Sequence, residues 1–119
     1  MKENNRATGS RYEKKAMIYL EQQGYKIITS NYRCKKGEID IIAKDGECLV
    51  FCEVKYRTDE RKGNPLEAVE MKKQQTISNC ALYYLMEQKI ADNISCRFDV
   101  IGILGDEMFL IKDAFMFIG

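Results

Sequence analysis

Acidic side chains interrupt residues 37–44 (GEIDIIAK), a segment whose early alternation of polar and apolar residues predicts a β-strand. Glu38 and Asp40 fall on one face of this strand, because successive side chains of a strand point to opposite faces. By the same rule, Ile39 and Ile41 fall on the other face. We therefore expect two carboxylates on one face of a strand whose other face is apolar.

Charged side chains also continue an apolar face in residues 47–56 (ECLVFCEVKY), the next predicted strand. Residues 48–52 are apolar on both faces, which is typical of a central strand in a sheet that is covered on both sides. Glu53 and Lys55 then follow on the same face as Leu49 and Phe51. A carboxylate and an amine are thus expected on the most buried strand of the sheet.

The dipeptide Asp45-Gly46 between these two segments is a strong signal for a tight hairpin turn. A tight turn places Asp40 near the level of Glu53 across the strand pair, so that the two carboxylates can converge. Because buried unpaired carboxylates are costly, this cluster must be ion-paired, bound to a metal or placed at an open edge. An ion pair of Lys55 with Asp40 or Glu53, at a solvated end of the sheet, is the alternative to a functional site.

A further carboxylate lies on the predicted first helix. Glu13, Ala16, Met17 and Leu20 follow helical spacing, so Glu13 lies on the stripe that faces the core. The alternative is local, because Ser10 and Glu13 match a capping box, in which the glutamate bonds back to the start of the helix.

A lysine interrupts the apolar stripe of the second predicted helix. Val69, Lys73, Ile77 and Ala81 step by four residues, so that Lys73 shares the face of the apolar residues. Either Lys73 points toward the charged cluster, or its aliphatic stem passes its neighbours and its ammonium group reaches solvent.

These residue types favour a hard cation. The chain has no histidine, which excludes nucleophile systems and zinc sites that depend on imidazole. Carboxylates with one or two lysines suit Mg²⁺, which binds oxygen ligands and often shares one or two carboxylates with substrate phosphates. Such a cation polarises a phosphodiester and lowers the pKa of a bound water, while Lys55 orients that water or stabilises developing charge. The set therefore suits in-line hydrolysis of a phosphodiester.

The remaining chain must supply one domain, residues 1–119, to position these groups, since 119 residues are enough for one core but not for two. Its composition, 45% hydrophobic and 31% charged, is typical of a soluble globular protein. The order α-β-β-β-α-β-β predicts an α/β domain with a mixed, largely antiparallel sheet flanked by helices. The predicted elements are a helix from the cap at Ser10 to Gly24, strands 25–33, 37–44 and 47–56, a helix from the cap at Asn64 through Pro65 to about Gln88, and strands 97–104 and 108–115.

Nothing in the sequence indicates export or a membrane partner. No segment approaches the roughly 20 apolar residues of a membrane span, and the polar first ten residues lack the core of a signal peptide. The five cysteines contain no Cys-x-x-Cys pair, so we expect reduced, small apolar residues in a cytoplasmic protein.

Charge is unevenly spread along the chain. Residues 1–36 hold nine Lys or Arg against three acids, a net of +6, whereas residues 37–119 hold ten against fifteen, a net of −5. The total of +1 therefore does not exclude nucleic acid as a partner. It predicts modest non-specific binding, led by the basic first third and by residues 57–62.

Two motifs carry a family resemblance. Residues 37–40 (GEID), followed after 12 residues by residues 53–55 (EVK), resemble the PD-(D/E)xK signature of the restriction-endonuclease-like superfamily. Glu13 is similar to the additional acidic residue of the archaeal Holliday-junction resolvases. The chain resembles the YraN-type small bacterial proteins most closely over residues 37–57. That match continues through Gly9 and Glu13, residues 31–33, 73–74, 84–85, 97–100 and 114–115.

The resemblance implies a restriction-endonuclease-like core with a Mg²⁺ or Mn²⁺ cofactor. The implied metal ligands are Asp40, Glu53, Glu13 and the carbonyl group of Val54. Lys55 is the implied catalytic lysine, whereas Glu38 belongs to the motif without an assigned metal role.

Further residues are implied to face the site or to bind nucleic acid. These are Lys73, Gln74, Arg57 and Arg33. Thr76 departs from the family pattern, because a basic residue is expected there, and this departure bears on a phosphate contact rather than on the chemistry.

The leading expectation is a Mg²⁺-dependent endonuclease acting on DNA, including branched or damaged DNA. A homodimer is compatible with a branched substrate, because it would relate two sites by a two-fold axis. The alternatives are a non-catalytic nucleic-acid-binding module on the same fold, and a structural protein that works through protein contacts.

Overall fold

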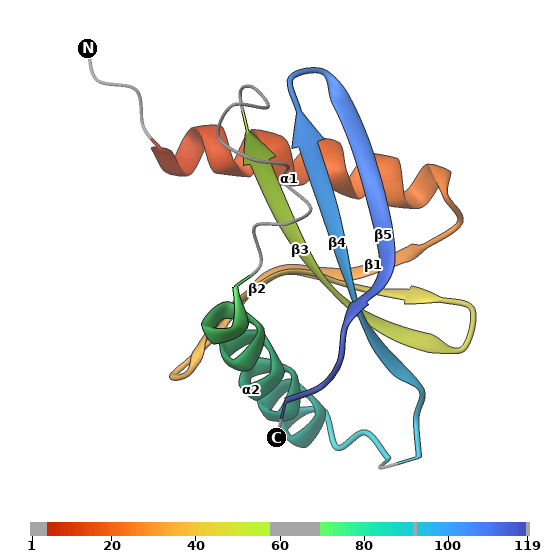
Figure 1. Cartoon of the computed structure of the whole chain (residues 1–119). Coiled ribbons are helices and arrows are strands. Elements are labelled where there is room, and N and C mark those ends of the chain that lie inside the picture. The colour runs from red at the N-terminus through yellow and green to blue at the C-terminus, as the bar shows by residue number, and fades with distance from the viewer. Residues whose placement is uncertain (1–4, 58–69, 92, 119) are drawn as a thin grey trace.

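The computed structural model describes residues 5–57, 70–91 and 93–118. Its elements follow the predicted order α-β-β-β-α-β-β (Figure 1). They are α1 (Asn5–Gln22), β1 (Lys26–Cys34), β2 (Gly37–Asp45), β3 (Cys48–Arg57), α2 (Met71–Glu87), β4 (Cys96–Leu104) and β5 (Glu107–Phe115). Each strand begins and ends within one residue of its predicted position.

The five strands form one sheet in the order β1-β2-β3-β4-β5. β3 and β4 are parallel, and the other neighbouring pairs are antiparallel, as expected for a mixed, largely antiparallel sheet. The parallel pair requires a crossover, and α2 lies between these two strands in the sequence. The turn at Asp45-Gly46 is the predicted tight hairpin, with Asp45 opposite Cys48 and Gly46 at a φ of +61°.

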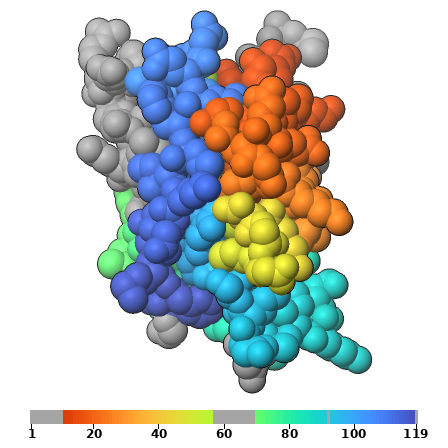
Figure 2. All heavy atoms as spheres, turned by 90° about the vertical axis from the view of Figure 1, so that its right-hand side faces the viewer, coloured from red at the N-terminus to blue at the C-terminus, as the bar shows by residue number. Residues whose placement is uncertain are grey.

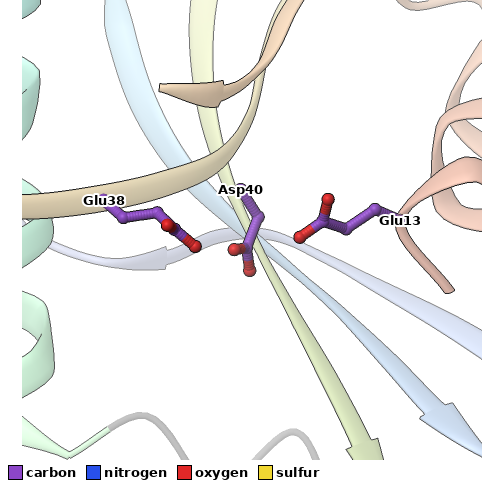
Figure 3. A group of neighbouring side chains, drawn as sticks. All are labelled: Glu13, Glu38 and Asp40. Carbon is purple, nitrogen blue, oxygen red and sulfur yellow. The ribbon is translucent and has the colours of Figure 1, made fainter. Parts of the chain in front are cut away.

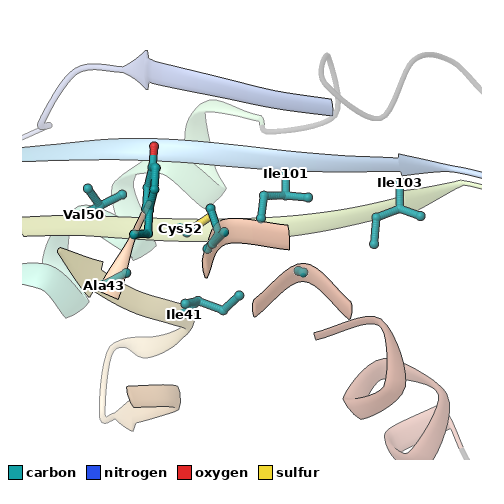
Figure 4. Close-up of a cluster of buried hydrophobic side chains, with 9 residues drawn as sticks. Ile41, Ala43, Val50, Cys52, Ile101 and Ile103 are labelled. Atoms are coloured by element: carbon teal, nitrogen blue, oxygen red, sulfur yellow. The ribbon is translucent and has the colours of Figure 1, made fainter. Parts of the chain in front are cut away.

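The two helices cover opposite faces of the central strand. One buried cluster joins α1 to the sheet face that carries Val50 and Cys52 (Figure 4). The second cluster joins α2 to the face that carries Leu49 and Phe51. Apolar residues on both faces of β3 therefore bury it between two layers, which confirms its predicted central place.

The predicted start of the first helix is wrong, and the second predicted helix is not continuous. α1 begins at Asn5, so Ser10 lies inside the helix and does not cap it. A Ser-x-x-Glu pattern also fits the interior of a helix, and the sequence around it decides where the helix begins. Glu70 is extended, with φ −67° and ψ 158°, and precedes the first residue of α2, so no continuous helix runs from residue 65 to residue 88. The predicted cap at Asn64 lies outside the described residues.

The ladder between β2 and β3 is shorter than the strands themselves. It runs from the pair Asp45 and Cys48 to the pair Ile41 and Cys52 and ends there. β2 continues to pair with β1 as far as Gly37. Ile39 packs in the α2 cluster and Ile41 in the α1 cluster, so the prediction that they share a face is wrong. The strict alternation of a strand is lost where β2 leaves its neighbour.

A buried polar network ties β4 to the hairpin turn. The Arg97 guanidinium donates through Nε to Asp99 Oδ1 at 2.9 Å and through Nη2 to Oδ2 at 3.1 Å. The Tyr25 hydroxyl donates to Asp99 Oδ2 at 2.6 Å, and the Asp113 N–H donates to Oδ1 at 2.9 Å. Arg97 also reaches Asp45 Oδ2 at 2.7 Å, and Figure 2 shows this yellow turn against the blue C-terminal strands. Each oxygen of the fully buried Asp99 carboxylate thus accepts hydrogen bonds.

Among the described helices, neither has the length and apolar character needed to cross a bilayer.

Replacing Arg97 should test whether this network is structural. Arg97→Met leaves Asp99, whose side chain is 0% exposed, without its cationic partner. We expect the free energy of unfolding to fall by about 3 kcal/mol, measured by urea titration. Lys112→Met is the matched control, because Lys112 also pairs with Asp45, at 3.5 Å, but is 54% exposed. The control should lose less than about 1 kcal/mol, and equal losses would contradict the assignment.

Candidate functional site

Asp40 lies at the point where β2 leaves β3. Its Oδ2 accepts a hydrogen bond from the Val54 N–H at 2.8 Å, immediately beyond the last paired residues of the ladder. The side chain thus binds a backbone donor of the central strand where the neighbouring strand no longer does. Val54 therefore helps to position the predicted ligand Asp40 through its N–H group. The role of its carbonyl group as a metal ligand stays a prediction.

Three carboxylates meet at this point. One oxygen each from Glu13, Glu38 and Asp40 lies within 4.8 Å of the other two, and all three residues are half-buried. Figure 3 shows Asp40 between the other two, with Glu38 reaching in from β2 and Glu13 from α1. Among the three carboxylates, Glu13 is the one that α1 supplies, and the other two come from β2.

Glu13 is held in this group and not in a helix cap. Its carboxylate hydrogen-bonds the side chain of Asn31, a β1 residue in the left-handed region with a φ of +54°. Burial raises the pKa of Glu13, and the negative charges of Asp40 and Glu38 raise it further, against the Asn31 hydrogen bond. The capping-box alternative for Glu13 is therefore wrong, and its role as a metal ligand stays a prediction.

Glu53 is the most buried member of the site, with a side chain only 6% exposed. It hydrogen-bonds Asp40, which confirms that the two carboxylates converge. Burial, that hydrogen bond and the charge of Asp40 together raise the pKa of Glu53 to about 9, while Lys73 and Lys55 lower it. Glu53 Oε2 has no hydrogen-bond partner among the described residues. A buried oxygen in this state is a candidate ligand atom.

The predicted lysines approach Glu53 from two elements. Lys55 follows it on the same face of β3, and its positive charge lowers the Glu53 pKa. Lys73 lies in the first turn of α2 and places Nζ 3.9 Å from Glu53 Oε2. The ammonium group of Lys73 is thus directed at the Glu53 carboxylate. Because the Lys73 side chain is 39% exposed, it also reaches solvent. Gln74 is half-buried beside it, and Arg57 is the last residue of β3.

Glu38 is the site residue that the sequence interpretation left without a role. Its carboxylate lies with that of Asp40, as the alternation of side chains along this strand predicted, and it belongs to the family motif. Arg33, predicted to bind nucleic acid, donates from Nε to Glu38 Oε2 at 2.9 Å. Arg33 is 63% exposed, so this ion pair leaves most of its surface open to a further partner.

Close packing of α2 against the β1–β2 turn positions the lysine-bearing end of the helix. Gly37 has a φ of +148°, and a Cβ at this residue would lie 2.4 Å from Thr76 Cγ2. The Thr76 hydroxyl donates to the Lys72 carbonyl group at 3.1 Å. A short, branched side chain thus fills this contact, which gives a physical reason for Thr76 where the resemblance implies a basic residue.

The donor set fits a hard divalent cation. The converging atoms are carboxylate oxygens, the ligands that Mg²⁺ and Mn²⁺ prefer. Two independent observations favour such a cation: the buried Oε2 atom of Glu53 has no hydrogen-bond partner among the described residues, and the oxygens of the three half-buried carboxylates lie close together. Mutual repulsion of these groups would be relieved by a bound cation.

Comparisons with known proteins all assign the chain to one protein family. A family model described as uncharacterised protein family UPF0102 matches residues 12–103. A UPF0102 protein of Lachnoclostridium phytofermentans is 48% identical over 112 residues, covering 94% of this chain and 95% of that protein. A UPF0102 protein of Syntrophus aciditrophicus is 46% identical over 115 residues, covering 93% of this chain and 90% of that protein. A UPF0102 protein of Caldicellulosiruptor saccharolyticus is 42% identical over 118 residues, covering 94% of this chain and 99% of that protein.

Magnesium titration should identify the ligands. If these carboxylates hold Mg²⁺, adding it to the metal-free chain should raise the melting temperature in a concentration-dependent way, because a ligand that binds the folded state alone stabilises that state. Asp40→Asn should abolish this shift, and Glu38→Gln should weaken the apparent affinity by roughly tenfold. Asp106→Asn, an exposed carboxylate in the β4–β5 turn, is the matched control and should behave like the wild type. Wild-type affinity in Glu38→Gln would exclude Glu38 as a ligand.

The raised pKa of Glu53 should make the metal-free chain pH-sensitive. Folded Glu53 keeps its proton up to about pH 9, whereas the unfolded side chain loses it near 4.5, so stability falls as pH rises through this range. Glu53→Gln removes the dependence, and near the upper end of the range it should be more stable than the wild type by roughly 2 kcal/mol. Urea titrations at several pH values measure this difference. The exposed control Glu107→Gln should show no such gain, and a gain that grew toward low pH would contradict the sign.

Proposed function

Because the chain belongs to UPF0102, a family described as uncharacterised, we propose its function from the site: a divalent-cation-dependent endonuclease that hydrolyses DNA phosphodiesters, on a restriction-endonuclease-like core. The observation that carries this proposal is the group of three carboxylates at Asp40, together with the buried Glu53 that hydrogen-bonds Asp40 and lies 3.9 Å from Lys73 Nζ. Hard-cation ligands beside amines are the groups that phosphodiester hydrolysis requires.

The carboxylates would hold Mg²⁺ or Mn²⁺. Asp40 and Glu53 offer the central oxygens, and Glu13 and Glu38 approach Asp40 from α1 and β2. When bound, the cation supplies Lewis-acid polarisation of the phosphodiester and lowers the pKa of a coordinated water. Asp40 lies on β2 and Glu53 on the neighbouring β3, so the sheet would hold these two ligands in place even without the cation.

Lys55 and Lys73 would act on the negative charges of the Glu53 carboxylate and of the phosphate. Lys73 and Lys55 both lower the pKa of Glu53 and so favour the ionised carboxylate that ligates a cation. Lys55 lies two residues along β3 from Glu53, where it can orient the attacking water and stabilise negative charge developing on the phosphate. Lys73 is the positioning residue, because its ammonium group contacts the ligand Glu53.

Exposed basic side chains flank the site and support a phosphate-rich substrate. They lie on α1 beside Glu13 and around the β1–β2 turn beside Glu38. They are Arg11, Lys14, Lys15, Arg33, Lys35 and Lys36. Cations on both sides of a carboxylate centre would bind the backbone of DNA while the centre remains free for a metal ion.

Cleavage assays test the proposal. Single-stranded, duplex and branched DNAs should be cut in the presence of Mg²⁺ or Mn²⁺ and left intact when the metal is chelated. Asp40→Ala and Lys55→Ala should each lower the rate by on the order of 100-fold or more. Lys26→Ala, an exposed lysine at the start of β1, is the matched control and should cut like the wild type, whereas cleavage that persists in Asp40→Ala and Lys55→Ala would reveal a contaminating nuclease.

The failures of this assay have distinct meanings. Equal cleavage by the wild type, Asp40→Ala and Lys55→Ala would reject this site as the catalytic centre. Metal-independent, salt-dependent DNA binding without turnover would instead indicate a non-catalytic nucleic-acid-binding module. No salt-dependent affinity for DNA would exclude both and leave a role in protein contacts.

A further inference from the structure

Two cysteines from distant parts of the chain meet beneath the β1–β2 turn. Cys34 ends β1 and Cys80 lies on the inward face of α2, 46 residues later. Their Sγ atoms are 3.2 Å apart. A disulfide bond needs about 2.05 Å, so an approach of about 1 Å would join them. The sequence interpretation treated all five cysteines as inert apolar residues and did not predict this contact.

The two thiols differ in accessibility. Cys34 is half-buried, whereas Cys80 is buried. The Lys36 N–H donates to Cys34 Sγ at 3.3 Å. Burial, and then the neighbouring Cys34, raise the pKa of Cys80 to about 12. An oxidant therefore reaches Cys34 first, and Cys80 is placed to react with the product.

We propose that Cys34 and Cys80 form a reversible intramolecular disulfide when the protein meets hydrogen peroxide. In the first step, the Cys34 sulfur attacks one peroxide oxygen and the O–O bond breaks, giving a sulfenic acid on Cys34 and one water. In the second step, the Cys80 sulfur attacks the Cys34 sulfur, and the sulfenic hydroxyl leaves with the Cys80 proton as a second water. The two thiols lose two electrons in total, which the peroxide accepts.

This modification site is independent of the proposed nuclease function but lies next to its residues. Cys34 pairs with Gly37 across the turn, one residue before Glu38. Cys80 follows Lys73 by two helical turns on the same helix. The disulfide would therefore fix the hairpin that carries Glu38 to the helix that carries Lys73.

Peptide mapping of the full chain tests the proposal. After brief treatment with equimolar hydrogen peroxide, non-reducing digestion and mass spectrometry should give a peptide linked through Cys34 and Cys80. Reduction with dithiothreitol should reverse the link. Because the bond closes a long loop in the unfolded chain, the melting temperature of the oxidised protein should rise by roughly 10 °C.

Substitutions separate this pair from the other thiols. Cys34→Ser and Cys80→Ser should each abolish the linked peptide and the thermal shift, whereas Cys96→Ser should retain both. Cys48 is the internal comparison: its Sγ accepts a hydrogen bond from the Ser95 hydroxyl, and in the described part of the chain the thiol that contacts Cys34 is Cys80. Oxidation of wild-type Cys34 to a sulfinic acid, or a bridge between other cysteines or between two molecules, would overturn the proposal. The wild-type map decides the matter even if a variant fails to fold.

Discussion

The candidate site depends on one backbone donor of the central strand. β3 is paired with β2 only as far as Cys52, and the N–H of Val54 lies beyond that ladder in a half-buried place. An unsatisfied buried N–H is unfavourable, and the carboxylate of Asp40 accepts its hydrogen bond at 2.8 Å. This contact lets β2 turn away from β3 and keep pairing with β1, which takes Glu38 toward α2. The carboxylates of Glu13, Glu38 and Asp40 lie close together where the β2–β3 ladder ends.

Two buried carboxylates of this sheet show how a structural group differs from a candidate ligand. Asp99 is fully buried, and both of its oxygens accept hydrogen bonds from Arg97. Glu53 is nearly as buried, but its cation, Lys73, stands 3.9 Å away and Oε2 lacks a hydrogen-bond partner among the described residues. Asp99 contributes to the fold because its charge is compensated, whereas Glu53 retains an oxygen with capacity for a ligand.

Much of the fold and part of the site follow from local patterns. Alternation and turn chemistry placed every strand within one residue, and the likeness to the YraN-type proteins agrees with the family match. The same alternation placed Glu53 beside Asp40 and on the face of β3 that meets α2. It failed at Ile39, which packs in the α2 cluster and not with Ile41 in the α1 cluster. The cap at Ser10 also failed, since a short motif does not show whether the helix continues before it.

The sequence by itself determined the order of the elements, the central place of β3 and the presence of charges on its buried face. These follow from side-chain periodicity and turn preferences, which act between near neighbours in the chain. Only the tertiary structure decided that Ile39 and Ile41 pack against different helices, that Arg97 pairs with Asp99 as a structural group, and that Cys34 meets Cys80. Each of these outcomes depends on how far strands stay paired and on how closely a helix packs. Those distances are set by the whole core, and residue spacing does not encode them.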